Sequence, residues 1–231
     1  MYTKLLQLLV ENFYLEGEIS LPVKAKSLII FSHGSGSGRY SPRKRFLARE
    51  LHKAGYGTLL FDLMSHKETE KYDQRFDIEL LTRRLVSITL WIYNHAEYQH
   101  LELGYLGSGT GSASALSAAV KLENIIKAVV SRGGRTDLVP KEILNKVVSP
   151  TLLIVGELDF HTLKLNKKTS KHLRCPNQLM VVPGASHLME EPGKMKLVAN
   201  GSITWFGKYL KAGKMDPALE YDLPGEEVNL E

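Results

Sequence analysis

The length and composition of the chain suit a single domain that mixes helices and strands. It has 231 residues, of which 43% are hydrophobic and 24% are charged, so it can bury a substantial core. No stretch approaches the ~20 apolar residues that cross a bilayer. The apolar run near the N-terminus is short and interrupted by Gln7, and the single cysteine, Cys175, excludes an internal disulfide. We therefore expect a cytoplasmic protein.

The charge is unevenly distributed along the chain. The formal net charge is +5, with 30 Lys and Arg against 25 Asp and Glu, but six of the acids and none of the basic residues follow Lys214. The part up to Lys214 therefore carries +11. A solvated basic surface is the preferred interpretation, because no aromatic-interleaved basic motif or recognition helix is present. We expect one domain over residues 1–211, an acidic tail over 212–231, and neither nucleic acid nor membrane as a partner.

Short apolar runs rich in Val, Ile and Leu alternate with amphipathic segments along the chain. The first 23 residues are interpreted as one or two antiparallel strands. Strands are then predicted over residues 28–34, 57–63, 101–107, 126–134, 150–159 and 177–187, and helices over 43–55, 76–96, 110–121, 162–173 and 192–210. Near-continuous apolar strands alternating with helices indicate a parallel sheet covered on both faces.

An open parallel sheet binds its ligand at the carboxyl ends of its strands. This rule selects the candidate functional loops without any motif. They are residues 33–45, 62–75, 107–111, 131–137, 156–162 and 184–193.

Three of these loops carry residues in the order that hydrolases use. A glycine-flanked turn at 107–111 is followed by Asp159 after one strand and by His187 after the next. Nucleophile, acid and histidine follow strands in this order in α/β-hydrolases. A serine needs a base to take its proton, and the base needs an acid to fix its tautomer. Alone, Asp159 is better explained as a cap and His187 as a loop histidine, but together they predict an acid–base pair.

The glycines of the turn identify the position of the nucleophile. Such a turn is so tight that the residues two before and two after its centre must be glycine. Gly107 and Gly111 satisfy this requirement only when residue 109 is the centre. Centring the turn on Ser108 or on Ser112 places larger residues at the flanks. Residue 109 is itself glycine, so the turn lacks a reactive side chain.

Backbone groups near this turn are predicted to bind an oxyanion. The helix that begins at Thr110 offers N–H groups and a partial positive charge. The "HGSG" segment follows an early strand, where hydrolases place a second oxyanion donor, and we assign that donor to Ser35 or Gly34. The glycine-rich turn lacks GxGxxG spacing and a phosphate-binding lysine, and no HExxH or paired CxxC motif occurs, so we expect no cofactor and no metal.

The chain resembles the dienelactone-hydrolase-like branch of the α/β-hydrolases over about residues 14–210. The resemblance rests on "LIIFSHGSGSGRYSPRKR", "GTLLFDL", "RFDIELLTRRL", "AVVSRGGRTDL", "PTLLIVGELD" and "VPGASHLMEEPG". It implies a three-layer α/β-hydrolase fold with a mostly parallel eight-stranded sheet and an antiparallel second strand. It also implies hydrolysis of esters or lactones through Ser or Cys. The similar relatives carry Gly-x-Ser-Thr-Gly at the turn, where this chain has Gly109 in place of the serine.

Two further features concern the ligand. The segment between "SRGG" and "SPTLLIVG" is too short for a helical lid domain, so we expect a small pocket. Six cationic residues lie in or just past the candidate loops. They either bind an anionic small molecule or pair with Asp62, Asp77 and Glu68, and both interpretations stay open. They are Arg39, Arg43, Lys44, Arg45, Arg132 and Arg135, and the predicted binding residues among them are Arg39, Arg43, Arg132 and Arg135.

Three hypotheses for function follow from a turn without a nucleophile. The chain is a non-catalytic relative that binds a ligand or partner, or an enzyme in which His187 and Asp159 activate water or remove a proton from carbon. Alternatively, Gly109 is an engineered replacement in an ordinary ester hydrolase. Nothing in the sequence indicates the substrate or the oligomeric state.

Overall fold

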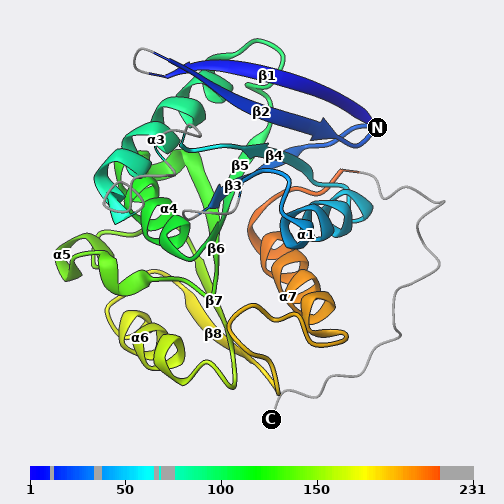
Figure 1. Ribbon diagram of the computed structural model, residues 1–231. Coiled ribbons are helices and arrows are strands. Elements are labelled where there is room, and N and C mark those ends of the chain that lie inside the picture. Colours follow the sequence, from blue (N-terminus) through cyan, green and yellow to red (C-terminus); the bar gives the residue numbers. More distant parts are fainter. Residues whose placement is uncertain (11–12, 34–37, 65–67, 69–75, 214–231) are drawn as a thin grey trace.

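The computed structural model describes residues 1–10, 13–33, 38–64, 68 and 76–213 (Figure 1). The acidic tail predicted over 212–231 lies outside the described residues from 214 onward. Within the described part, no helix combines the length and the apolar composition needed to cross a membrane.

Eight strands form one sheet in the order β1-β2-β4-β3-β5-β6-β7-β8. β1 pairs antiparallel with β2 and β2 antiparallel with β4, while the remaining pairs are parallel. The predicted mostly parallel sheet with an antiparallel second strand is confirmed. The strands are β1 Tyr2–Val10, β2 Phe13–Leu21, β3 Ser27–His33, β4 Gly57–Phe61, β5 Glu102–Ser108, β6 Ile126–Arg132, β7 Thr151–Gly156 and β8 Asn177–Val182.

The sheet lies between two layers of helices (Figure 1). One face is covered by α1 and α7, and the other by α3, α4, α5 and α6. The helices are α1 Pro42–Lys53, α3 Ile78–Asn94, α4 Thr110–Lys121, α5 Lys141–Leu144, α6 Phe160–Ser170 and α7 Lys194–Tyr209. All seven residues of β3 and all six of β7 are buried. This is why their sequences are nearly continuous apolar runs, as expected for strands covered on both faces.

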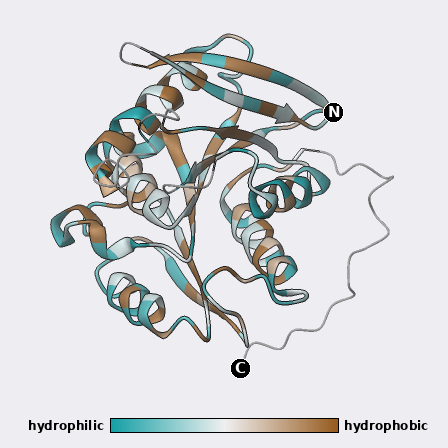
Figure 2. Cartoon of the chain, in the orientation of Figure 1, coloured by the Kyte–Doolittle hydropathy of each residue, from teal (hydrophilic) through white to brown (hydrophobic). Residues whose placement is uncertain are grey.

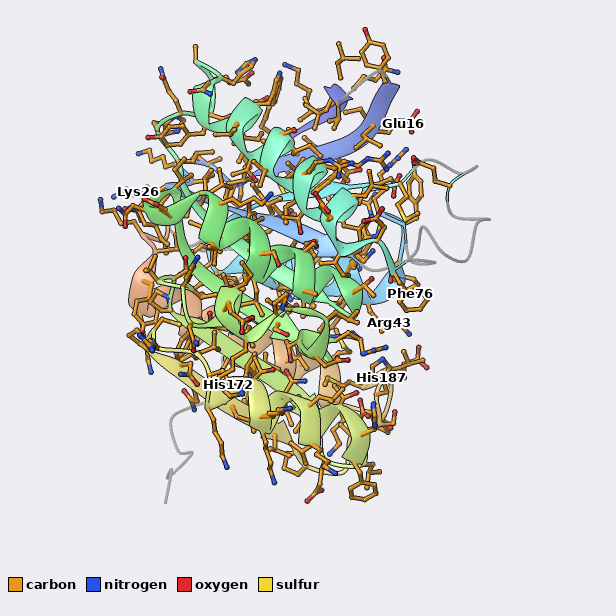
Figure 3. All side chains as sticks on the ribbon, turned by 90° about the vertical axis from the view of Figure 1, so that its left-hand side faces the viewer. Glu16, Lys26, Arg43, Phe76, His172 and His187 are labelled. Carbon is orange, nitrogen blue, oxygen red and sulfur yellow. The ribbon has the colours of Figure 1, made fainter. Side chains whose placement is uncertain are left out.

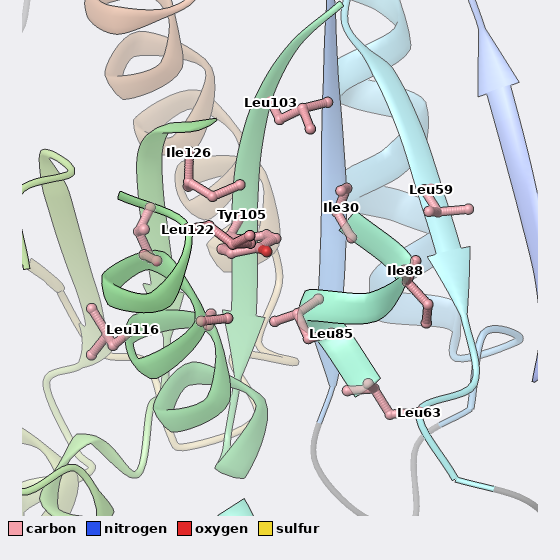
Figure 4. Packing of buried hydrophobic residues seen from close by; sticks show 14 of the residues in the cluster. Ile30, Leu59, Leu63, Leu85, Ile88, Leu103, Tyr105, Leu116, Leu122 and Ile126 are labelled. Atoms are coloured by element: carbon pink, nitrogen blue, oxygen red, sulfur yellow. The ribbon is translucent and has the colours of Figure 1, made fainter. Parts of the chain in front are cut away.

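Two hydrophobic cores fill the spaces between the sheet and its helices. On the side of α3 and α4, Leu85 and Ile88 pack with Tyr105 of β5 (Figure 4). On the other side, Leu47 of α1 and Phe206 of α7 belong to the second core. Figure 2 shows the apolar residues concentrated in the sheet and on the helix faces toward it. Each helix is therefore held mainly by burial of one apolar side.

The β1–β2 hairpin extends the sheet at one edge. Leu6, Leu8 and Val10 are buried, whereas Leu5 and Leu9 are 71% and 62% exposed. This alternation is the period of a strand with one face on the core. Because the outward positions also carry leucines, the alternation of apolar and polar residues is incomplete. The sequence therefore leaves open whether this region forms one strand or two.

The connection between β6 and β7 contains no lid domain. Its residues, 133–150, are all described, and they hold only the short 3₁₀ turn η3 Thr136–Leu138 and the four-residue helix α5. The carboxyl ends of β5, β6 and β7 are therefore left accessible from that side.

Candidate active site

The turn between β5 and α4 has the backbone of a nucleophile elbow. Gly109 lies between the two elements with φ 56° and ψ −129°, a conformation that side-chain-bearing residues rarely adopt. The carbonyl of Gly109 accepts hydrogen bonds from the backbone N–H of Ser112 at 3.1 Å and of Arg135 at 3.0 Å. These two bonds tie the turn to its own helix and to the loop after β6.

Steric contacts explain the glycines on either side of the turn. A Cβ atom at Gly107 would lie 2.6 Å from Cα of Ser112, and one at Gly111 would overlap the carbonyl oxygen of Ser32. A Cβ atom at Gly109 would meet no atom within 4 Å. The backbone thus demands glycine at 107 and 111 and leaves free space at 109.

Asp159 and His187 are brought together although they lie 28 residues apart. Asp159 caps α6, where its Oδ1 accepts from the backbone N–H of Thr162 at 3.2 Å, and its Oδ2 lies 2.6 Å from Nδ1 of His187. Burial opposes ionisation of Asp159, but the hydrogen bonds from His187 and Thr162 prevail and lower its pKa. A carboxylate on Nδ1 orients the ring and leaves Nε2 available as a base.

Gly109 and His187 line one cavity of about 250 Å³. Its apolar wall is formed by Phe31, Leu47, Leu106 and Leu188, and its polar wall includes serines and cationic side chains. The cavity lies at the carboxyl ends of β3, β5 and β6, where the topology predicts a ligand. This volume suits a small molecule.

The predicted oxyanion groups are only partly described. Thr110 is the first residue of α4 and is 5% exposed, so the N–H groups of the first turn of α4 begin beside Gly109. Gly34 and Ser35 lie outside the described residues.

The four predicted arginines divide into two pairs. Arg43 and Arg132 line the cavity. Arg39 is ion-paired with both Asp62 and Glu16, and Arg135 forms two 2.9 Å hydrogen bonds with Asp137. The structure does not bring these last two to the cavity. Figure 3 shows Arg43 and His187 on the same side of the molecule, with Glu16 toward the β1–β2 hairpin.

Lys44, one of the cationic residues that the sequence places just past a candidate loop, lines the same cavity. It lies in the first turn of α1, is 6% exposed, and its Nζ donates to the carbonyl of Gly38 at 3.0 Å. Burial lowers the pKa of Lys44 to about 7, with Asp62 opposing and Arg132 and Arg43 reinforcing the shift. Its burial was not predicted, and the signal for it is the position of Lys44 on the face of α1 that also carries Leu47 and Leu51.

No three His, Cys, Asp or Glu side chains among the described residues are grouped so that they could hold a metal ion. The described site offers Asp159, His187, cationic side chains and backbone groups.

The strand order, the glycine-flanked turn after β5, the acid after β7 and the histidine after β8 define the α/β-hydrolase class. The chain belongs to the dienelactone hydrolase family of that class. It is 42% identical to dienelactone hydrolase from Anabaena variabilis, with a TM-score of 0.87 over 91% of this chain and 99% of that one. No family model matches the chain.

More distant structures share the fold. Est1E from Butyrivibrio proteoclasticus is 14% identical, with a TM-score of 0.76 over 88% of this chain and 98% of that one. Carboxyl esterase 2 from Tuber melanosporum is 15% identical, with a TM-score of 0.70 over 91% of this chain and 88% of that one.

Two curated relatives are longer proteins of Mycobacterium tuberculosis. Each is 44% identical over 194 residues, or 84% of this chain, and carries the provisional name phosphoribosyl transferase. The chain spans 44% of the length of these relatives.

Proposed function

We propose that the chain binds a small carboxylic ester or lactone beside Gly109 and hydrolyses it with a water molecule activated by His187. Asp159 orients the ring of His187, and backbone N–H groups at the start of α4 stabilise the oxyanion. The reaction proceeds without an acyl-enzyme, because Gly109 offers no oxygen to attack the substrate.

The observation that carries this proposal is the assembled pair of Asp159 and His187. The 2.6 Å hydrogen bond between them lies at the rim of the cavity that contains Gly109. A carboxylate held against Nδ1 of a histidine in this place supports proton transfer. The pair gives His187 the orientation of a general base.

The space at position 109 supplies room for the attacking water. A Cβ atom there meets nothing within 4 Å, so a water molecule can occupy the volume that a serine hydroxyl would fill. Nε2 of His187 takes a proton from this water as its oxygen bonds to the acyl carbon. The same nitrogen then returns the proton to the leaving oxygen as the ester bond breaks, which yields an acid and an alcohol.

The name of the Anabaena variabilis relative supports an ester or lactone as the substrate class. The transferase name belongs to proteins more than twice as long as the segment matched, so it does not favour that activity for this chain. A cytoplasmic location is part of the proposal, supported by the one cysteine, Cys175, which is buried and unpaired.

Binding without turnover is the second candidate function. It is favoured by the absence of an attacking side chain at Gly109 and by the cationic wall of the cavity, which can hold an anionic ligand. In that case Asp159 and His187 contribute to binding rather than to proton transfer.

One set of variants tests the two candidates together. Hydrolysis of p-nitrophenyl acetate and dihydrocoumarin is measured for the unmodified chain, His187→Ala and Gly109→Ser, with His172→Ala as a matched control outside the cavity. We expect turnover by the unmodified chain, its loss in His187→Ala and its retention in His172→Ala. A fluorophosphonate probe should label Gly109→Ser alone. Equal rates for the unmodified chain and His187→Ala would overturn the hydrolytic proposal in favour of binding.

A further inference from the structure

The cavity beside Gly109 has one wall that is lined by cationic side chains. Arg132 ends β6, and Arg43 and Lys44 begin α1. All three line the cavity. Glu190 is ion-paired with Arg43, and Asp62, which also attracts Lys44, is ion-paired with Arg39.

Arg132 gives the strongest indication that an anion binds at this wall. Its residue is 7% exposed, and within the described part of the chain its buried Nε has no hydrogen-bond partner. Nη1 of its guanidinium lies 3.9 Å from the thioether sulfur of Met195, and a thioether is a weak acceptor. A buried guanidinium is normally paired with an acid, because an uncompensated charge in the interior is costly. An anionic ligand would supply the missing partner.

Lys44 places a second cation in the same wall. Its Nζ donates to the carbonyl of Gly38, which is a neutral acceptor. Burial lowers the pKa of Lys44 to about 7 against the attraction of Asp62, and burial together with Arg43 lowers the pKa of Arg132 to about 10 against the attraction of Glu190. Both shifts reflect charged groups held away from water and near one another.

The N-terminus of α1, which is the positive end of the helix dipole, lies at the same wall of the cavity. Ser41 precedes the helix, lines the cavity and makes no side-chain capping hydrogen bond. The twelve-residue helix therefore offers orphan N–H groups and the positive end of its dipole beside Lys44.

We propose that Arg132, Lys44 and the N-terminus of α1 form a subsite for a phosphate monoester group carried by the substrate. This inference rests on the proposed function, because it places the ester or lactone carbonyl toward Gly109 and the phosphate toward α1. The guanidinium of Arg132, the amine of Lys44 and the first N–H groups of α1 offer more donors than the two oxygens of a carboxylate can accept from, whereas a phosphate monoester presents three terminal oxygens. The planar guanidinium can donate two parallel hydrogen bonds to phosphate oxygens.

Calorimetric titration with phenyl phosphate and with benzoate at pH 7 tests the subsite. The two probes share a ring and differ in charge, because a phosphate monoester carries about −1.5 to −2 at this pH. We expect phenyl phosphate to bind at least tenfold more tightly than benzoate. Arg132→Gln and Lys44→Met should each weaken phenyl phosphate binding at least tenfold. Arg45→Gln, on the same helix but paired with Glu18 outside the cavity, should leave it unchanged.

The inference is overturned if benzoate binds as tightly as phenyl phosphate, or if Arg132→Gln and Lys44→Met both bind phenyl phosphate like the unmodified chain. Circular dichroism melting of each variant establishes that the folded protein is titrated, and Lys44→Met serves if Arg132→Gln does not fold. The readout is heat of binding, so it does not depend on turnover. Loss of the proposed hydrolysis with intact, Arg132-dependent phosphate binding would leave the subsite standing.

Discussion

Gly109 combines a positive φ with open space where a side chain would lie. At φ 56° and ψ −129° a non-glycine residue carries strain of about 1–3 kcal/mol, and glycine removes that strain together with the reactive oxygen. The neighbouring pair of Asp159 and His187 is still assembled around this position. Under the proposed function, His187 acts as an oriented base beside free space, where a serine-dependent hydrolase has a hydroxyl.

Replacing Asp159 by Asn should separate the orienting role of its carboxylate from its capping role. The amide oxygen can still accept from Thr162, so α6 keeps its cap, whereas the amide cannot hold His187 in the basic tautomer. We expect ester hydrolysis to fall by roughly 10²–10⁴-fold with little loss of stability. The control is Asp77→Asn, because Asp77 caps α3 at Leu80 and lies outside the cavity. Unchanged kcat/KM in Asp159→Asn would exclude this role.

Lys44 should make the folded state less stable as the pH falls. Its pKa is about 7 in the folded chain against 10.5 for a free lysine, so the unfolded chain binds the proton more tightly. The folded state loses stability as the pH falls from 10.5 toward 7, and the penalty is complete below pH 7.

Lys44→Met should therefore raise the free energy of unfolding by roughly 1–3 kcal/mol at pH 6 and by much less at pH 10. Urea denaturation at the two pH values measures the difference. Equal effects at pH 6 and pH 10 would show that the charge of Lys44 is not buried at a cost.

At the scale of elements, the site is built where β5, β6 and β7 end and where α1, α4 and α6 begin. The elbow depends on a close approach between β3 and α4, which the hydroxyls of Ser32 and Ser114 also bridge at 2.8 Å. Gly111 lies at this approach, and Gly109 at its open side. The two glycines therefore serve different purposes although they are two residues apart.

Alanine substitutions should distinguish these two glycines. Gly111→Ala forces a Cβ atom into the carbonyl of Ser32 and should destabilise the fold by roughly 3 kcal/mol or more. Gly109→Ala meets no neighbouring atom and pays only backbone strain, about 1–2 kcal/mol. Chemical denaturation of both variants measures the difference. A larger loss in Gly109→Ala than in Gly111→Ala would contradict this description of the elbow.

Over the whole molecule, the features that sequence predicts well are those with a strong local cause. Continuous apolar runs identify β3 and β7 because both faces of these strands are buried. The order of turn, acid and histidine anticipates the contact between Asp159 and His187, because the carboxyl ends of neighbouring parallel strands meet at one edge.

The features that sequence leaves open depend on distant partners. Arg39 and Arg43 are four residues apart, yet the first pairs with Glu16 of β2 and the second reaches the cavity. No local pattern separates them, because the hairpin that supplies Glu16 is placed by the whole sheet. Lys44 is likewise buried by the packing of α1 on the sheet. A charged residue in the first turn of a helix does not by itself predict such burial.

The most direct test of the central claim is a pre-steady-state measurement of p-nitrophenol release from p-nitrophenyl acetate. Direct attack by water predicts linear release from the start in the unmodified chain, loss of this release in His187→Ala, and a burst of one p-nitrophenol per active site in Gly109→Ser. A burst in the unmodified chain would contradict the account, because it would require a covalent nucleophile other than residue 109.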